Sequence, residues 1–531
     1  MSGGFRQSQS TLHTWSGLLV GWVLYAMFLS GTASYWRGEI TRWTTPEVVP
    51  SSESAAVRAE QAMGFLQAHA SGAQEWTIQL PGERGAGTEV SWQRGEGRAD
   101  PADSAVLSRG GQAVAVRETK GGDFFYRLHF DLHYVPVIWG RWIAGFCAMF
   151  MLVAIVSGVI THKKIFVDFF TFRRGKGQRS WLDGHNALAV LALPFHLMIT
   201  YTGLVALMTL YMPFGVSANY PSRDAMYAEL FPRPPEVAAS GVAAPLVAIA
   251  PLLKRAERDW GGGAVEVVEI AHPGDRNARV LITRANASRI VDGNGRIEFD
   301  GASGAMTWRK PSTDAATDTR GAMIGLHAAR FAPLTMRWLF FLSSLAGTVM
   351  VASGLVLWTV KRRARLGDPQ RPQRLHLGFR LVETLNIAFI AGMPLAMVGF
   401  LWANRLLPLG LKDRAQWEIH AFFLIWAACL LWSVLRRPRR AWLELLSAAA
   451  VLSAGLPIFN IALTDRGLFD TLAAGDSALY GMDLGLFAAA IILGLIAWAV
   501  HRHAPARTPV RERTRQAASA DGAVVTVGPA T

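Results

Sequence analysis

The feature that most constrains this chain is a series of eight apolar stretches, each long enough to cross the roughly 30 Å of hydrocarbon in a bilayer. Hydrophobic residues make up 51% of the 531 residues and charged residues only 17%, below the quarter or so that is usual in globular domains. We therefore predict an α-helical polytopic membrane protein with about eight transmembrane helices. The predicted spans are residues 13–35, 135–161, 184–211, 335–360, 377–403, 416–435, 441–462 and 479–501.

Lysine and arginine gather in the loops on one side of the predicted bundle. Clusters follow the second, fourth, sixth and eighth spans, whereas the short loops on the other side carry few, such as the single Arg466 between the seventh and eighth spans. Because positively charged loops stay on the cytoplasmic side, both termini are predicted to be cytoplasmic. Much of the net charge of +14 is this bias, so it indicates contact with anionic lipid and not nucleic-acid binding.

The first four spans form a repeated pair. In the first and third spans a histidine precedes a hydroxyl residue and a glycine. In the second and fourth spans an Arg-Trp pair precedes a serine and a glycine. The number of residues between the two parts of each pattern is the same in both copies. These positions are His13 with Ser30-Gly31, Arg141-Trp142 with Ser157-Gly158, His185 with Thr202-Gly203, and Arg337-Trp338 with Ser353-Gly354. Small residues let helices approach closely, so we interpret the glycines as packing contacts.

The two longest connections, residues 36–134 and 212–334, resemble each other. Each holds an amphipathic helix pattern, at residues 55–70 and 245–260, followed by short alternating runs such as WTIQL and ARVLITR. This order predicts two small α+β domains, inserted between the first and second spans and between the third and fourth. The other segments are residues 1–35 (first span), 135–211 (second and third spans), 335–365 (fourth span), 366–503 (a C-terminal bundle of four spans) and 504–531 (a disordered cytoplasmic tail).

His185 and His196 stand eleven residues apart within the third span. At 100° per residue they leave the same helix face, and at 1.5 Å per residue they lie about 16 Å apart along the axis. Ionisable residues inside a bilayer are costly and usually functional, and two metal-ligating side chains at different depths suit a two-centre electron wire. In the repeat, His13 is the counterpart of His185, and Leu24 is the counterpart of His196.

Several segments together resemble a known family. They are LHTWSGLLVGW with LSG in the first span, LHFDLH before the second, DGHNALAVLALPFHLMITYTGL in the third, GLHAAR before the fourth, and FDGASGAMTW in the second connection. As a set, over roughly residues 10–365, the chain resembles the PepSY-associated transmembrane proteins. These are iron-regulated inner-membrane proteins of bacteria that include haem-containing ferric-siderophore reductases. The resemblance implies that the α+β domains are PepSY-like and periplasmic and that the protein lies in the bacterial inner membrane.

In the family's reductase members, paired histidines hold b-type haems. Carried over to this chain, the resemblance implies two haem b groups with His13, His133, His185, His196 and His327 as candidate ligands. The repeat pairs His13 with His185 at the cytoplasmic side. For the outer haem, His196 with His133 or with His327 is the main prediction, and His133 with His327 is the other option. We interpret His129, four residues before His133, as part of an amphipathic surface.

The predicted function is a membrane-bound ferric-siderophore reductase that passes electrons across the membrane to a ferric siderophore or similar chelate in the periplasm. No GxGxxG motif follows a strand, and the cytoplasmic loops are short, so the chain has no room for a flavin or nicotinamide domain. A membrane quinol or a separate reductase is then the electron donor. The resemblance also suggests Tyr211, Tyr220 and Tyr227 as part of the docking surface, and no catalytic residue is assigned.

Two other classes of function compete with this one. The chain could be a non-redox PepSY membrane protein that binds or regulates a periplasmic partner, in which case the histidines are interfacial and the protein is colourless. It could also be a siderophore or iron transport component, with the substrate carried by the C-terminal bundle. The polar residues of that bundle are few, which argues against transport.

Overall fold

The computed structural model describes residues 4–82, 84–85, 87–95, 103–161, 169–170, 173, 175–285, 290–291, 295–366 and 376–502. Among these residues, seven helices are long and apolar enough to cross a membrane, and a bent pair of shorter helices makes an eighth candidate span. This agrees with the predicted eight spans. The tail predicted at residues 504–531 and most of the basic loops after the second and fourth spans lie outside the described residues.

The candidate spans carry large apolar side chains on their outer surfaces, as helices in contact with lipid do. Ile143 and Phe146 of α5 and Ile491 and Ile492 of α20 are examples. The spans are α1 (Phe5–Ser34), α5 (Val137–Thr161), the bent pair α7 (Gln178–Leu191) and α8 (Leu193–Ala206), α14 (Leu334–Leu366), α15 (Leu377–Ile390) continued by α16 (Gly392–Leu406), α17 (Arg414–Leu435), α18 (Pro438–Leu463) and α20 (Ser477–Arg502).

The third span is not straight, because α7 and α8 meet at an angle of 67°. Pro194 is the second residue of α8, and a proline there has no N–H to continue the hydrogen-bond ladder of α7. Ala192, between the two helices, leaves the helical conformation. The spacing of His185 and His196 along a single straight axis, assumed from the sequence, is therefore wrong.

The remaining elements belong to the two long connections and to one loop of the C-terminal bundle. The helices are α2 (Arg37–Thr44), α3 (Ala55–His69), α4 (Gly121–Asp131), α9 (Met208–Tyr211), α10 (Phe214–Asn219), α11 (Arg223–Leu230), α12 (Ile249–Asp259), α13 (Ala315–Ala328) and α19 (Leu468–Ala473), with a short 3₁₀ turn at Arg109–Gly111. The strands are β1 (Glu75–Gln79), β2 (Thr88–Gln93), β3 (Ser104–Leu107), β4 (Ala113–Val114), β5 (Val265–Ala271), β6 (Arg279–Arg284), β7 (Arg296–Asp300) and β8 (Met306–Arg309).

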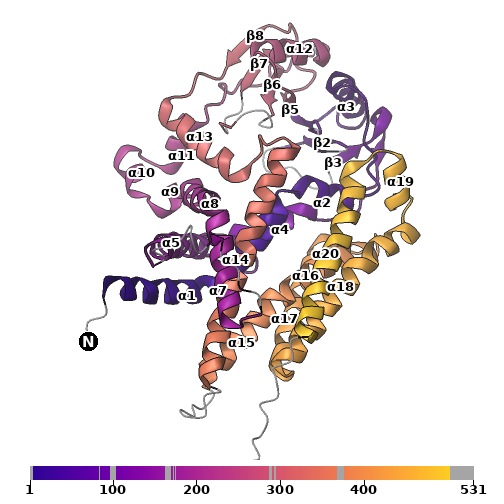
Figure 1. Ribbon diagram of the computed structural model, residues 1–531. Helices are drawn as coiled ribbons and strands as arrows, with labels where there is room; N and C mark the ends of the chain where they lie inside the picture. The colour runs from indigo at the N-terminus through magenta and orange to yellow at the C-terminus, as the bar shows by residue number, and fades with distance from the viewer. Residues whose placement is uncertain are drawn as a thin grey trace, which may run out of the picture.

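The two connections do not form two separate domains with their own sheets, as the sequence suggested. Their strands join into one antiparallel sheet of eight strands in the order β4-β3-β2-β1-β5-β6-β7-β8. The junction is the pairing of β1 with β5, in which Trp76 faces Ile270 and Ile78 faces Val268. Pairing these edges removes two exposed strand edges that separate domains would leave open. Figure 1 shows the sheet, with α3 and α12, at one end of the long helices.

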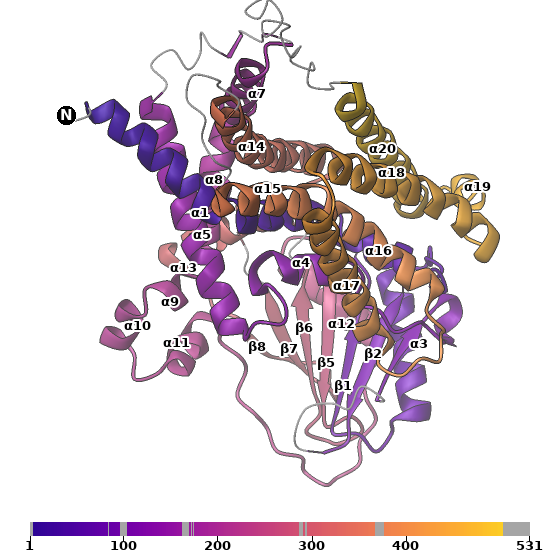
Figure 2. The ribbon, with the colours of Figure 1, turned by 90° about the horizontal axis from the view of Figure 1, so that it is seen from below.

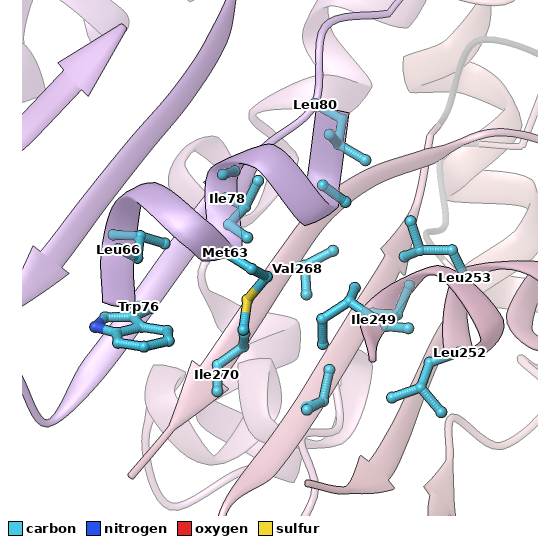
Figure 3. Packing of buried hydrophobic residues seen from close by; sticks show 14 of the residues in the cluster. Met63, Leu66, Trp76, Ile78, Leu80, Ile249, Leu252, Leu253, Val268 and Ile270 are labelled. Carbon is cyan, nitrogen blue, oxygen red and sulfur yellow. The ribbon is translucent and has the colours of Figure 1, made fainter. Parts of the chain in front are cut away.

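One hydrophobic core unites the two halves of the sheet. Met63 and Leu66 of α3 pack with Ile249 and Leu253 of α12 on the same face of the sheet (Figure 3). Ile78 of β1 is fully buried in this cluster. The predicted helix-then-strands order of each connection is thus confirmed, but the hydrophobic faces of both are buried against each other.

The C-terminal bundle, α15 to α20, lies along one side of the other long helices (Figure 2). A buried polar network attaches it to α2. The indole of Trp43 donates to Asp483 of α20 at 2.8 Å, and the guanidinium of Arg405 in α16 lies 3.8 Å from the centre of the same ring. Arg405 also donates to the Trp43 carbonyl at 2.6 Å. The C-terminal bundle, whose polar residues are few, therefore contacts the repeated part through charged side chains.

Candidate functional site

Two histidines face each other at the ends of α1 and α7 that lie away from the sheet. The ring centroids of His13 and His185 are 6.3 Å apart and the rings are inclined by 67°. We call them the distal pair. The structure thus brings together the two histidines that the repeat pairs.

Hydrogen bonds define which ring nitrogen of each distal histidine carries the hydrogen. Nδ1 of His13 lies 2.8 Å from the carbonyl oxygen of Ala154 in α5, and Nδ1 of His185 lies 2.9 Å from that of Met350 in α14. A carbonyl oxygen only accepts, so Nδ1 carries the hydrogen in both rings. Each Nε2 then keeps its lone pair, the form in which an imidazole binds a metal.

A second pair lies beneath the sheet. The ring centroids of His129 in α4 and His327 in α13 are 6.1 Å apart, with 35° between the planes. His129 Nδ1 lies 2.6 Å from the carbonyl oxygen of Met27 in α1. His327 hydrogen-bonds to the backbone of Ile199 in α8, and its Nδ1 is 3.1 Å from the hydroxyl of Thr202. We call these two residues the proximal pair.

The proximal histidines are held in their neutral form. Burial lowers the pKa of His129, and burial together with the neighbouring His129 lowers the pKa of His327 to about 4. Both imidazoles are therefore uncharged at neutral pH, so no proton competes for Nε2.

Each of the four histidines lies over one of the repeat glycines. A Cβ added to Gly31 would lie 2.8 Å from Nδ1 of His129, and one added to Gly203 would lie 2.9 Å from Cε1 of His327. At Gly158 and Gly354 the same atom would lie 3.2 Å from His13 and 3.1 Å from His185. The glycines do serve close packing, as predicted, but what packs on them is an imidazole.

The four contacts share one local geometry. The carbonyl that each histidine contacts belongs to the residue four positions before the glycine, on the same helical face. The hydroxyl residue just before the glycine donates a hydrogen bond to this carbonyl or to the carbonyl of the preceding residue. These hydroxyls are Ser30, Ser157, Thr202 and Ser353. The Ser/Thr-Gly dipeptide of the repeat is therefore a seat for one imidazole, present four times.

The spacing within each pair fits a metal held between two imidazoles. With a metal–nitrogen distance of about 2.0 Å on each side, two axial imidazoles have ring centroids about 6 Å apart. The distances of 6.3 Å and 6.1 Å match this value. No group of three or more His, Cys, Asp or Glu that could hold a bare ion occurs among the described residues. Two axial histidines and no further protein ligand is the donor set of a bis-histidine haem.

The two pairs stand at different depths of the same helices. His13 and Met27, which contacts His129, are fourteen residues apart on α1, or about 21 Å along the axis. Between them lies a cluster of buried apolar residues that includes Val20, Leu24, Cys147, Met151 and Met350. This layer of apolar side chains separates the two sites.

A cavity of about 1310 Å³ contains the proximal pair and continues toward the sheet. Its inner part is apolar, with Met27, Phe28 and Met151 among its lining residues. Its outer part is rich in arginine, and its acidic lining residues are Glu89 and Glu266. The arginines are Arg37, Arg42, Arg84, Arg141, Arg330 and Arg337. The volume exceeds the upper end of common small-molecule pockets, about 1,000 Å³, so it has space for a large ligand beside the histidines.

His196 is not brought to either pair. Its ring neighbours are Phe28 and Phe195, and it packs on Gly347 of α14 with Nε2 3.0 Å from where a Cβ would be. This Nε2 is buried and has no hydrogen-bond partner among the described residues. The predicted pairing of His196 with His133 or His327 is thus not found. The bend at Ala192 and the packing of the ring on Gly347 direct His196 into the apolar layer.

His133 is also directed elsewhere, and His129 takes the place expected for it. A left-handed turn beginning at Leu132 ends α4 and carries His133 onto Phe423 of the C-terminal bundle, with 16° between the rings. His129 was missed because it stands twelve residues before Arg141, whereas His327 stands ten before Arg337. The Leu-His dipeptide that both share also occurs at His133, so the sequence offered no way to choose.

The predicted tyrosines are spread along the connection after α8. Tyr211 lines the cavity, and its hydroxyl donates to the Arg141 carbonyl at 2.9 Å. Tyr220 and Tyr227 lie farther along, at the end of α10 and in α11, and are absent from the cavity lining described here. Of the three, only Tyr211 is placed to meet a ligand of the proximal pair.

Comparison with known proteins agrees with the repeated part of the chain. A family model described as the PepSY-associated TM region matches residues 10–361. An uncharacterized protein of Pseudomonas aeruginosa is 26% identical over 303 residues, which are 54% of this chain and 74% of that protein. The family match includes all four seats and all four paired histidines and ends before α15, so the C-terminal bundle lies beyond it.

Proposed function

Because the chain belongs to the family of PepSY-associated transmembrane proteins, and because it brings four histidines into two facing pairs, we propose that this multi-pass membrane protein is a di-haem oxidoreductase. Its location would be the bacterial inner membrane. Its two centres would carry electrons across the membrane to a ferric siderophore or similar chelate in the periplasm, which makes it a ferric-siderophore reductase of iron acquisition. The single observation that carries the proposal is the repeated geometry of the pairs.

The protein's own part is to hold and orient the ligands. His13 and His185 would hold one haem b, and His129 and His327 the other. The carbonyls of Met27, Ala154, Ile199 and Met350 set the tautomer and direct each Nε2 toward its partner. Bound haem would supply a one-electron Fe(III)/Fe(II) couple, and filling both axial positions favours electron transfer over oxygen chemistry.

The acceptor end is supported by charge and access. The proximal pair opens into the arginine-rich cavity under the sheet, whereas basic residues such as Arg437, Arg439 and Arg440 gather at the opposite ends of the spans. By the positive-inside rule, this arrangement supports a periplasmic location for the sheet and the cavity. Most of the cavity arginines are ion-paired, for example Arg37 with Asp123, so the chelate would meet their remaining N–H donors and not an uncompensated charge. Fe(II) has less preference than Fe(III) for hard oxygen ligands, so a reduced chelate would release its iron. A quinol or a separate reductase would be the donor.

A visible spectrum of the protein purified from haem-replete cells tests the proposal. Sharp α and Soret bands on reduction with dithionite, with about two haems per chain, are the expected result. A colourless protein would contradict the proposal and favour the non-redox or transport alternatives. A ferric chelate with a ferrous trap then tests the acceptor, because the pre-reduced protein should lose its ferrous bands as the trap develops colour.

A further inference from the structure

The turn between α4 and α5 contacts the C-terminal bundle through an unusual run of backbone conformations. Leu132, His133 and Tyr134 all have positive φ, at 56°, 34° and 54°. Such conformations cost non-glycine residues of order 1 kcal/mol or more each and persist only where the surroundings hold them. The run turns two consecutive polar aromatic side chains toward α17.

Hydrogen bonds hold Tyr134 against α17. Its hydroxyl hydrogen-bonds to Nδ1 of His420, and the Tyr134 and His420 rings are parallel with centroids 5.8 Å apart. Gln416, one helical turn before His420, also hydrogen-bonds to the same hydroxyl. Since Nδ1 of His420 is engaged by Tyr134, Nε2 is the ring nitrogen through which this imidazole would meet a further partner.

His133 completes a cluster of rings around this pair. It stacks on Phe423 at 5.5 Å and meets the Tyr134 ring edge-on at 4.5 Å, while Trp417 meets His420 at 5.3 Å. Burial and the neighbouring His420 lower the pKa of His133, so its imidazole is neutral and has a lone pair that accepts a hydrogen bond. The cluster thus offers donors, an acceptor and aromatic faces within one site.

The cluster lies on the outer surface of the helices and not in the cavity. Tyr134 and Trp417 remain 58% and 48% exposed, and their neighbours Val137 and Trp139 are exposed too. His420 lies six residues from the start of α17, about 9 Å down the helix from its sheet end. A polar hydrogen-bonded pair at this depth, open to lipid, suits a ligand that arrives through the bilayer.

We propose that His133, Tyr134 and His420, with Phe423 and Trp417, bind the head group of a membrane quinol. A hydroquinone presents two hydroxyls on opposite sides of a flat ring, which matches an imidazole acceptor on one side and an imidazole or phenol on the other. Its ring stacks on aromatic side chains and its tail stays in the lipid. A cluster that only anchored the chain at the membrane surface would need neither the hydrogen-bonded pair nor the strained turn.

The significance of this site rests on the proposed function. His133 follows His129 by four residues, so their Cα atoms are at most about 14 Å apart. Oxidation of one quinol to quinone releases two electrons and two protons. The two electrons equal the capacity of the two proposed one-electron centres. The neutral imidazole of His133 would accept one proton, and the other would be released to water. Electrons from a quinol bound here would enter at the proximal centre, on the same side as the acceptor. This route would supply the chelate without transfer across the membrane, and the distal centre would hold the second electron until an acceptor arrives.

Photoaffinity labelling with an azidoquinone, mapped by mass spectrometry on the full chain in lipid nanodiscs, tests binding without any redox step. Label is expected at the turn after α4 and in the first two turns of α17. Tyr134→Phe and His420→Phe each remove one hydrogen-bonding group but keep a ring, and each should weaken labelling about tenfold. Tyr480→Phe, at the same end of α20, is the matched control and should change nothing.

Stopped-flow reduction of the same proteins separates this inference from the proposed function. Decylubiquinol and menadiol, tried separately, identify the quinol class, and dithionite reports the haems independently. Slow quinol reduction in Tyr134→Phe and His420→Phe, with unchanged dithionite spectra, supports the site. Label scattered over the lipid-facing surface and unaffected by the variants overturns it, as does reduction by dithionite but by neither quinol, which would leave a separate reductase as the donor.

Discussion

The two halves of the duplicated region support the same contact with different surroundings. In the first half α1 carries His13 and the seat of His129, and α5 carries the seat of His13. In the second half α7 and α8 carry His185 and the seat of His327, and α14 carries the seat of His185. Each centre takes one histidine from each half, so neither half forms a site alone.

The halves differ in how they hold the histidine of the proximal pair. In the first half α4 is enclosed by α2 and the C-terminal bundle, with Phe124 and Phe125 buried against Phe400. In the second half α13 begins with exposed residues and packs mainly on α8. The first span is also one continuous helix, whereas the third is broken into two helices at an angle of 67°. The seats have kept their geometry while the scaffold around them has diverged, which indicates that ligand orientation is the constrained property.

The largest effects should come from the ligands, and they test whether each centre is shared between halves. His13→Ala and His185→Ala should each remove the distal haem, and His129→Ala and His327→Ala the proximal one. A His13/His185 double variant should lose no more than either single variant, whereas His13/His129 should be colourless. Haem per chain by pyridine haemochrome measures this, and a double variant within one pair that loses both haems would contradict the pairing.

Removing the polar contact between the C-terminal bundle and α2 should lower the stability of the first half only. Arg405→Met leaves Asp483 and the Trp43 carbonyl without their buried cation, which costs about 3–5 kcal/mol of stability. The proximal haem should then be lost at lower temperature than the distal haem. Thermal unfolding followed at the Soret band measures this.

The matched control is an ion pair in the second half. Arg279→Met removes the pair with Asp300, which is partly exposed, and should cost no more than about 1 kcal/mol. If Arg405→Met leaves the proximal haem as stable as it is in the Arg279→Met variant, the bundle does not support the first half.

The seats themselves should show a graded response. Gly31→Ala adds a methyl 2.8 Å from His129 and should cost about 1–3 kcal/mol through overpacking, seen as a weakened proximal haem. Gly158→Ala, where the contact is 3.2 Å, should cost less and act on the distal haem. Gly17→Ala meets nothing within 4 Å on the same helix and is the control. Equal effects at all three positions would show that helix propensity, not the imidazole seat, explains them.

The smallest effect is expected at His196, a position at which the first half has a leucine, Leu24, in place of the histidine. His196→Leu introduces the residue found at the repeat counterpart, Leu24, and removes a buried nitrogen without a partner. Both haems should remain, with stability within about 1 kcal/mol of the parent or slightly above it. Loss of one haem in this variant would restore His196 as a ligand.

Much of the local structure could be predicted from the sequence, because it depends on nearby residues. Span positions follow from hydrophobic length, and α3, α12 and the strands that follow them show their periodicity directly. The pairing of His13 with His185 could be predicted from the repeat, because equivalent helices carry their equivalent residues at the same depth. The family resemblance is confirmed by the match over residues 10–361. The haem, the electron transfer and the siderophore remain proposals.

The parts that sequence reasoning missed depend on contacts between distant segments. The pairing of β1 with β5 joins residues almost two hundred positions apart, and nothing within either strand selects it over a free edge. His129 and His133 look alike in sequence, and a three-residue left-handed turn decides which one faces His327. The function of the glycines was visible only once the imidazoles lay over them.

By itself the sequence determined a membrane protein with eight spans and a duplication. It also showed histidines within the spans, where ionisable side chains are costly and usually functional. Hydrophobic length, charge bias and repeated spacing are properties of neighbouring residues, so they can be read along the chain. The tertiary structure alone decided which histidines meet. A ligand pair depends on the direction of two side chains from different helices, and that direction is set by a bend, a left-handed turn and four glycine seats contributed by other segments.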